Sequence, residues 1–401
     1  MGQISADRVI FHIDVNSAFL SWSAVQRLSE GETLDLRTVP SAVGGDVATR
    51  HGVILAKSIP AKKYNIVTGE PVVDALRKCP ELILVKPDHE RYHEFSRAFI
   101  NILYDYTDLI EQFSVDEAFM DMTGTRRLFG DPVDCANRIR ERIYRELGFT
   151  VNVGVSSNKL LAKMASDFEK PNRTHTLFPE EVPAKMWILP IRDLFFVGKA
   201  AERKLRSLGI NTIGDLAHTE PEIISGVMKK HGEVLWRNAN GIDDSPVETV
   251  RPDNKGYGNS TTVSFDVTDA TTAKAILLNL TDKVCARLRK DDVKADTVCV
   301  QFRYNDLSRA SHQCTLGAAT NISQEIYSNV CRLFDEKWDG TPIRLLGVST
   351  KVAQEDCGRQ IDLFDTTDYE KLEKLDKAMD SIRERFGGDA IRRASSLDNK
   401  S

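Results

Sequence analysis

Long apolar runs are absent from this sequence of 401 residues. No uninterrupted stretch approaches the ~18 residues that a membrane-spanning helix requires. The N-terminal MGQISADR contains no apolar core of the kind that secretory signals carry. We therefore expect a cytoplasmic protein that is not held in a membrane.

Paired cysteines and a strong positive charge are also missing. The seven cysteines form no C-x-x-C pair, which indicates free thiols in a reducing compartment and argues against a zinc ribbon. The formal net charge of −5 excludes a globally basic nucleic-acid coat, so any nucleic-acid surface must be local. At 41% hydrophobic and 28% charged residues, the chain is typical of globular proteins with about two to four domains.

The N-terminal half reads as strand, helix, strand, strand, helix, strand once an insertion at 17–88 is set aside. This order is that of the split βαβ, ferredoxin-like arrangement. The first strand run, RVIFHIDVN, ends at Asp14 and Asn16. The later elements are a helix over 90–106, strand runs on either side of residues 116 and 117, a helix over 132–147 and a strand over 149–156.

Asp116 and Glu117 are adjacent carboxylates in the otherwise apolar and aromatic run FSVDEAFMDM. An ionised carboxylate is costly to bury unless it is paired, hydrogen-bonded or bound to a metal. An exposed acidic turn between two strands is the alternative. In the ferredoxin-like order Asp14 comes close to Asp116, and a hairpin bend would turn both acids toward it. Converging carboxylates suit Mg²⁺, and two such ions can clamp the oxygens of a phosphoryl displacement.

Lysines flank the predicted carboxylate site on two segments. IPAKKYN contains Lys62 and Lys63, and VSSNKLLAKMASD contains Lys159 and Lys163. Lys159 begins a predicted helix, where the dipole favours anions. Each lysine alone is typical of a solvated surface, but their joint position beside the carboxylates favours a triphosphate site.

The sequence pattern changes in the C-terminal half of the chain. FFVGKAAERKLRSLGINTIGDLA has the pattern of a helix-hairpin-helix, which offers Gly198 and Lys199 to a phosphate backbone without reading bases. A plain small helical domain is the alternative. The polar, Pro- and Gly-rich residues 242–258 suggest a linker. An α+β segment follows, in which a basic helical cluster that includes Arg289 is more typical of a solvated face.

Four segments together resemble the motif series of Y-family DNA polymerases, in the DNA polymerase IV (DinB-type) branch. In chain order they are FHIDVNSAF, IPAKKY, FSVDEAFMD and VGVSSNKLLAKMASDFEKPN. The order and spacing fit, and the resemblance continues to about residue 355. The last two motifs are the most specific.

The resemblance implies an α+β multidomain fold: a right-hand polymerase with a ferredoxin-like palm, small fingers, a helical helix-hairpin-helix thumb and an α+β little finger. The implied boundaries are 1–19 and 85–168 for the palm, 20–84 for the fingers, 169–241 for the thumb, 242–258 for the linker, 259–355 for the little finger, and 356–401 for a tail with a clamp-binding-like peptide and an amphipathic helix.

Site residues follow from the resemblance by position. It implies that Asp14 and Asp116 bind two Mg²⁺ ions, that Glu117 binds the catalytic one, and that the Val15 carbonyl completes the nucleotide-side ion. Phe19 matches the aromatic steric gate, whose ring fills the space of a ribose 2′-OH. The positions that hold the triphosphate are Lys62 and Lys159.

Three positions depart from the family pattern and concern the nucleotide. A second bulky aromatic often precedes the gate, where this chain has Ala18. The usual Tyr and Arg of the triphosphate motif are Ile59 and Lys62, and Lys cannot make the bidentate fork of Arg. These departures bear on nucleotide affinity and lesion preference rather than on catalysis.

QIDLF resembles the bacterial sliding-clamp-binding peptide, with Gln360, Leu363 and Phe364 as anchors. A strand end that packs on its own domain is the alternative. The partners implied are primer-template DNA, a dNTP and a sliding clamp, for a monomer in the bacterial cytoplasm.

The sequence thus predicts an enzyme: a template-directed DNA polymerase that transfers a nucleotide from dNTP to a primer 3′-OH, error-prone and suited to damaged template. One rival is a non-catalytic DNA- and clamp-binding protein that keeps the fold, against which the three carboxylates and the gate weigh. Another is a nucleotidyl cyclase, which would leave the hairpin and little-finger segments without a role.

Overall fold

The computed structural model describes residues 8–45, 52–354, 367–388 and 390–393. The described residues form two compact units that divide between Arg251 and Pro252, inside the segment whose composition predicts a linker. Among the described helices, none is both long and apolar enough to cross a membrane.

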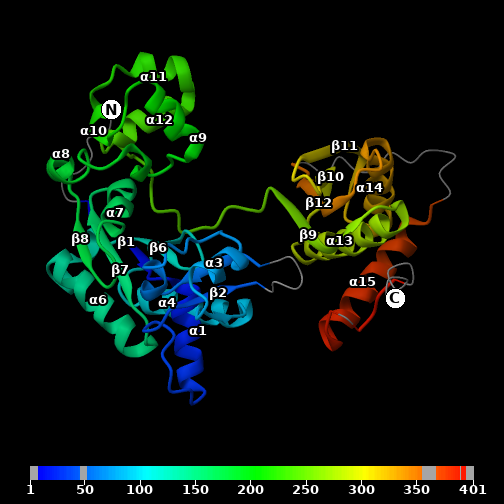
Figure 1. Ribbon diagram of the computed structural model, residues 1–401, viewed down its shortest axis with the longest axis horizontal. Helices are drawn as coiled ribbons and strands as arrows, with labels where there is room; N and C mark the ends of the chain where they lie inside the picture. The colour runs from blue at the N-terminus through cyan, green and yellow to red at the C-terminus, as the bar shows by residue number, and fades with distance from the viewer. Residues whose placement is uncertain (1–7, 46–51, 355–366, 389, 394–401) are drawn as a thin grey trace. The chain divides into compact units, whose positions relative to one another are not determined.

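A five-stranded sheet forms the centre of the first unit, in the order β5-β6-β1-β7-β8 (Figure 1). β1 is antiparallel to β6 and β7, and β8 adds in parallel to β7. Without β8, the remaining order β5-β6-β1-β7 is that of a ferredoxin-like sheet, which confirms the arrangement predicted from the sequence. The strands are β1 (Ile10–Val15), β5 (Ile110–Gln112), β6 (Glu117–Asp121), β7 (Val151–Ser156) and β8 (Thr174–Thr176).

Helices cover both faces of this sheet, and every residue of β1 is buried. The side chains of Phe11, Ile13 and Val15 in β1 pack with helices on one face, while those of Ile10, His12 and Asp14 lie on the other face, toward α7 (Lys159–Ser166). The first set of helices is α1 (Ala18–Ser29), α4 (His89–Tyr104) and α6 (Pro132–Leu147). A short helix, α5 (Arg126–Phe129), follows the 3-10 turn η2 (Thr123–Thr125).

The insertion forms a small sheet of its own, in the order β3-β2-β4. Its strand β4 pairs in parallel with β2, so β4 belongs to this small sheet and not to the central one. The elements are β2 (Ser41–Gly44), β3 (Ile54–Lys57), α2 (Ile59–Lys62), α3 (Val72–Lys78) and β4 (Ile83–Val85).

A bundle of short helices with its own apolar core completes the first unit. The predicted hairpin is present: Gly198 is the N-cap of α9, and Gly209 ends that helix with a φ of +84°. The elements are η3 (Pro179–Glu181), α8 (Val182–Lys185), η4 (Ile191–Asp193), α9 (Lys199–Ser207), α10 (Ile213–His218), α11 (Pro221–Met228) and α12 (Lys230–Ala239).

The second unit is a four-stranded sheet in the order β11-β10-β12-β9, with α13 and α14 packed on its apolar face. β9 begins at Gly256, three residues before the predicted start of the little finger at residue 259. The elements are β9 (Gly256–Val267), α13 (Ala270–Lys290), β10 (Ala295–Tyr304), β11 (Arg309–Thr320), α14 (Ser323–Lys337), β12 (Ile343–Val352) and α15 (Tyr369–Phe386).

A buried ion-pair cluster attaches α15 to this unit. The side chain of Arg289 on α13 is only 9% exposed and pairs with Asp376 and Asp380 of α15. The interpretation of this arginine as part of a solvated basic face is therefore wrong, because two carboxylates of α15 cover it.

Candidate active site

Asp14 and Glu117 occupy facing positions on the antiparallel strands β1 and β6. Directly opposed residues of an antiparallel pair point to the same face of the sheet, so both acids lie on the α7 side. Asp116 immediately precedes β6, and its carbonyl accepts a hydrogen bond from the Val15 N–H at 3.0 Å. The predicted meeting of Asp14 with the Asp-Glu pair is confirmed at the level of the backbone.

Two lysines of the EKPN-containing motif reach these carboxylates. Lys170 Nζ lies 2.6 Å from Asp14 Oδ1. Lys163 Nζ lies 3.2 Å from Glu117 Oε1 and 3.6 Å from Asp14 Oδ2. Sequence reasoning named Lys163 only as a general cation and missed Lys170, although the motif that contains Lys170 was part of the resemblance.

The two facing acids differ in their proton affinity. Burial raises the pKa of Asp14 to about 6, against the opposing charges of Lys170 and Lys163. Burial acts on Glu117 in the same direction, but the approach of His12, whose Nε2 lies 3.5 Å from Glu117 Oε2, and the charge of Lys163 outweigh it and lower the pKa of Glu117 to about 2. At neutral pH Glu117 is therefore a stable anion.

The donor chemistry of this edge suits a hard divalent cation, because it consists of carboxylate oxygens and a nearby backbone carbonyl. The carboxylates of Asp14 and Glu117 already share one cationic group, the ammonium of Lys163. Asp116 instead accepts a hydrogen bond from Ser114 at 2.6 Å. Among the described residues no three acidic, His or Cys side chains are grouped to hold a metal ion as they stand. Asp14 and Glu117 present carboxylate oxygens of this kind on one face of the sheet, whereas the carboxylate of Asp116 is held by Ser114.

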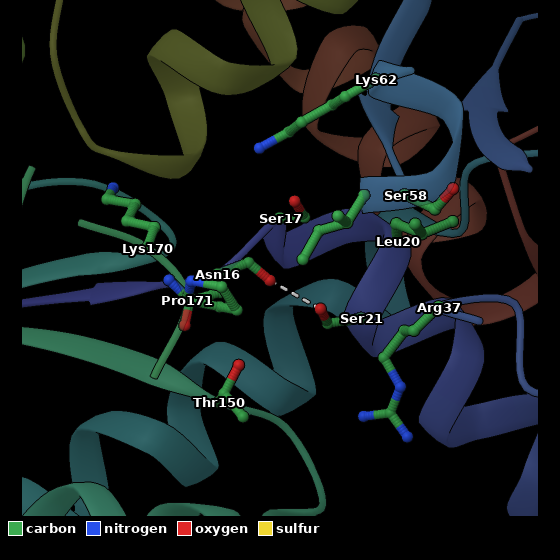
Figure 2. A pocket seen from close by; sticks show the side chains of 11 residues that line it. Asn16, Ser17, Leu20, Ser21, Arg37, Ser58, Lys62, Thr150, Lys170 and Pro171 are labelled. Atoms are coloured by element: carbon green, nitrogen blue, oxygen red, sulfur yellow. Dashed lines mark hydrogen bonds between the residues drawn. The ribbon is translucent and has the colours of Figure 1, made fainter. Parts of the chain in front are cut away.

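A cavity of about 180 Å³ lies beside the end of β1 (Figure 2). Lys62 and Lys170 both line it, from α2 and from the segment after α7. Its other lining residues are Asn16, Ser17, Leu20, Ser21, Arg37, Ser58, Ile59, Thr150 and Pro171. The N-cap bond from the Ala61 N–H to Ser58 Oγ begins the short helix that carries Lys62.

The other two predicted nucleotide residues lie elsewhere. The ring of Phe19 stacks on Tyr92, with centroids 4.6 Å apart and an interplanar angle of 9°. Lys159 does begin α7, as predicted, but its ammonium pairs with Glu111 at 2.6 Å. Glu111 was missed because no local pattern marks an acid that is distant in sequence from its partner.

Two regions were predicted to contact partners, one DNA and the other a sliding clamp, and only the first lies within the described residues. Gly198 and Lys199 are exposed at the start of α9, and the contacts among described residues give Lys199 no ion-pair partner. The clamp-like peptide with Gln360, Leu363 and Phe364 lies outside the described residues.

Comparison with known proteins covers both units of the chain. The impB/mucB/samB family profile matches residues 13–167, the profile of its C-terminal domain matches 254–363, and the HHH motif of the IMS family matches 179–210. Among solved structures, a Y-family DNA polymerase chimera superposes with a TM-score of 0.75 at 22% identity, over 86% of this chain and 98% of that one. That likeness establishes the fold.

Relatives match along almost the whole chain. DNA polymerase IV of Clostridium acetobutylicum is 44% identical, over 98% of this chain and 99% of the relative. DNA polymerase IV of Acetivibrio thermocellus is 39% identical, over 98% of each chain. DNA polymerase IV 2 of Bacillus subtilis is 38% identical, over 98% of this chain and 95% of the relative. The resemblance predicted from the motifs is confirmed: the chain belongs to the impB/mucB/samB family and shares the Y-family DNA polymerase fold.

Proposed function

We propose that this chain is a DNA-directed DNA polymerase that adds a nucleotide from a dNTP to a primer 3′-OH. The 3′ oxygen forms a bond to the α-phosphorus, the bond from that phosphorus to the β-phosphate oxygen breaks, and pyrophosphate leaves. The hydroxyl proton is lost to solvent. The observation that carries this proposal is the facing pair Asp14 and Glu117, with Asp116 beside them, at one end of the central sheet.

Membership of this family implies dependence on a divalent metal ion. We assign two Mg²⁺ ions to Asp14, Asp116, Glu117 and the Val15 carbonyl. When bound, the ions lower the pKa of the attacking hydroxyl and stabilise charge on the leaving pyrophosphate. The chain itself contributes carboxylates whose backbone positions are fixed by the pairing of β1 with β6. Little conformational entropy is therefore lost when they are ordered around an ion.

Cationic side chains prepare the site for a triphosphate. Lys62 lines the cavity beside β1, and Lys159 stands at the N-terminus of α7, where the helix dipole adds to its attraction for phosphate. Phe19 is the proposed steric gate against a ribose 2′-OH. Stacking on Tyr92 restricts movement of the Phe19 ring away from an incoming 2′-OH.

The parts of the chain take the proposed roles of palm, fingers, thumb and little finger, with the boundaries given above. Exposed Gly198 and Lys199 suit contact with a DNA backbone through a backbone N–H and a positive charge. Family membership supports synthesis on damaged template. The sliding clamp as partner of Gln360, Leu363 and Phe364, and the monomeric state, belong to the proposal as well.

Primer extension by the full chain and by Asp116→Ala, with Mg²⁺ and a dNTP, tests this function. Extension by the variant should fall by about 10²–10³-fold or more, the loss typical of a group that stabilises charge in a transition state. Glu141→Gln removes an acid whose side chain is 69% exposed on α6 and should extend normally. Undiminished extension by Asp116→Ala would overturn the site. Failure of the intact chain to incorporate any dNTP with Mg²⁺ or Mn²⁺ would favour a non-catalytic DNA-binding protein.

A further inference from the structure

Residues 241–248, which comprise the last residue of the predicted thumb and the start of the predicted linker, are bound to the N-terminal end of α7. Asn158, the N-cap of this helix, donates from Nδ2 to the carbonyl of Gly241 at 2.9 Å. The backbone N–H of Leu160 donates to Asp243 Oδ2 at 3.0 Å. The linker therefore satisfies helix-terminal groups that would otherwise need water or a ligand.

Glu111 on β5 ties the same segment to Lys159. Its Oε2 accepts hydrogen bonds from Lys159 Nζ at 2.6 Å and from the backbone N–H of Glu248 at 2.7 Å. Lys159 Nζ also donates to Glu111 Oε1 at 2.8 Å and to the carbonyl of Pro246 at 3.3 Å. Between them, Val247 packs against the buried residues Ile10, Phe119 and Ala162.

These contacts occupy all the hydrogen-bond donors of the Lys159 ammonium group. An ammonium group has three N–H donors, and here it has three acceptors: both oxygens of Glu111 and the carbonyl of Pro246. The side chains of Lys159 and Glu111 are only 13% and 16% exposed, so water screens their attraction weakly. A triphosphate can bind Lys159 only if at least one of these bonds is given up.

We infer that Glu111 is a positioning residue that couples triphosphate binding at Lys159 to the attachment of linker residues 246–248. The inference rests on the proposed role of Lys159. A nucleotide that draws Lys159 away breaks the hydrogen bond from Lys159 to the Pro246 carbonyl and so loosens the linker. Conversely, attachment of the linker weakens nucleotide binding. By linkage, the two effects are equal in size.

Hydrogen–deuterium exchange of the full chain measures the first effect. A dNTP with Mg²⁺ and no DNA allows binding without turnover, and it should raise deuterium uptake in the peptide that spans residues 242–251. In Glu111→Ala, uptake should already be high without nucleotide and should not rise further. Unchanged uptake in the wild-type chain on addition of saturating dNTP would overturn the coupling.

Steady-state primer extension measures the reciprocal effect. Glu111→Gln is nearly isosteric and keeps an acceptor for the Glu248 N–H, but it loses the charge that holds Lys159. The KM for dNTP should fall by about fivefold or more, at the lower end of typical coupling, with kcat within about twofold. A KM that is unchanged or raised would contradict the inference.

Two further variants separate the possible failures. Glu248→Ala removes a neighbouring negative charge but keeps the backbone N–H that Glu111 binds, so uptake and KM should match the wild type. Lys159→Ala should raise the KM for dNTP. If it does not, the triphosphate role of Lys159 fails and the coupling fails with it. If it does, while the Glu111 variants change neither readout, only the coupling fails.

Discussion

Lys170 donates a hydrogen bond to Asp14, with Nζ 2.6 Å from Oδ1. The carboxylate is nearly buried, at 10% side-chain exposure, whereas the lysine is 33% exposed. A carboxylate so little exposed is stable as an anion only beside positive charge. Lys170, together with Lys163, therefore keeps the acid of β1 in place when no metal ion is bound.

Lys170→Met should destabilise the metal-free protein by about 1–2 kcal/mol, less than a fully buried pair because the lysine is partly solvated. For the first unit this corresponds to a fall in Tm of about 3–6 °C. Thermal unfolding in EDTA and in excess Mg²⁺ measures it. The deficit should shrink in Mg²⁺, since a divalent cation replaces the lost charge.

Lys185→Met is the matched control, because Lys185 pairs with Glu181 at the surface with 41% side-chain exposure. Its Tm should change little and should not depend on Mg²⁺. Equal deficits of Lys170→Met in EDTA and Mg²⁺ would show that Lys170 acts only as a packing residue.

Local patterns were sufficient to predict the elements that carry the site. The helix over 132–147 is confirmed to the residue, because Asp131 caps its start and Gly148 ends it with a φ of +76°. The approach of Asp14 to Asp116 was predicted from element order alone, since the ferredoxin-like order makes their strands neighbours. That Glu117 is the residue directly opposite Asp14 emerged only from the strand register.

Contacts between distant segments could not be predicted in the same way. Lys159 and Glu111 are 48 positions apart, and Lys159 and Pro246 are 87 apart. Neither spacing leaves a periodic signal in the sequence. Composition likewise predicts only that residues 242–258 form a linker, and it does not show that the first of them satisfy the N-terminus of α7 and pack Val247 into a small apolar cluster.

Phe19→Ala should admit ribonucleotides, because the truncated side chain no longer fills the space of a 2′-OH. We expect the ratio of kcat/KM for rNTP over dNTP to rise by about 10- to 200-fold, the range for shape discrimination in an apolar pocket. Single-nucleotide primer extension with each substrate measures the ratio.

Tyr92→Phe provides the control for this gate. It keeps the ring that stacks on Phe19 but removes the hydroxyl, which lies 2.7 Å from Ser23 Oγ. The rNTP to dNTP ratio should stay as in the wild type. A ratio that does not rise in Phe19→Ala would mean that another group excludes the 2′-OH.

Gly154→Ala should disrupt the contact between β7 and α7. A Cβ at this position would lie 1.9 Å from the carbonyl oxygen of Ala162 and 2.6 Å from the N–H nitrogen of Ser166, both backbone atoms that cannot move alone. We expect a loss of about 3 kcal/mol or more of unfolding free energy, at the upper end of overpacking effects. Urea unfolding measures it.

The same experiment has a glycine control in the same unit. A Cβ at Gly124 would meet nothing within 4 Å, so Gly124→Ala should leave the midpoint nearly unchanged. A mild effect of Gly154→Ala would show that α7, and with it Lys159 and Lys163, can shift away from the sheet at little cost.

Asp376→Asn should release α15 from the second unit. The side chain of Asp376 is 4% exposed, and it binds Arg289 and Arg393 as well as the backbone N–H of Ser323. The Asn side chain loses the negative charge, and its NH₂ group places a hydrogen-bond donor against the donors of Arg289, Arg393 or the Ser323 N–H. The free energy of unfolding should therefore fall by about 3 kcal/mol or more. Trypsin should then cleave within α15 faster than in the wild type.

Glu370→Gln on the same helix tests whether the effect is specific to the buried cluster. Glu370 is 76% exposed and pairs with Lys374 in solvent, so its loss should change stability by less than about 0.5 kcal/mol. Trypsin cleavage within α15 should stay slow. Equal protection of α15 in Asp376→Asn would mean that apolar contacts such as that of buried Met379, rather than the ion pairs, hold the helix in place.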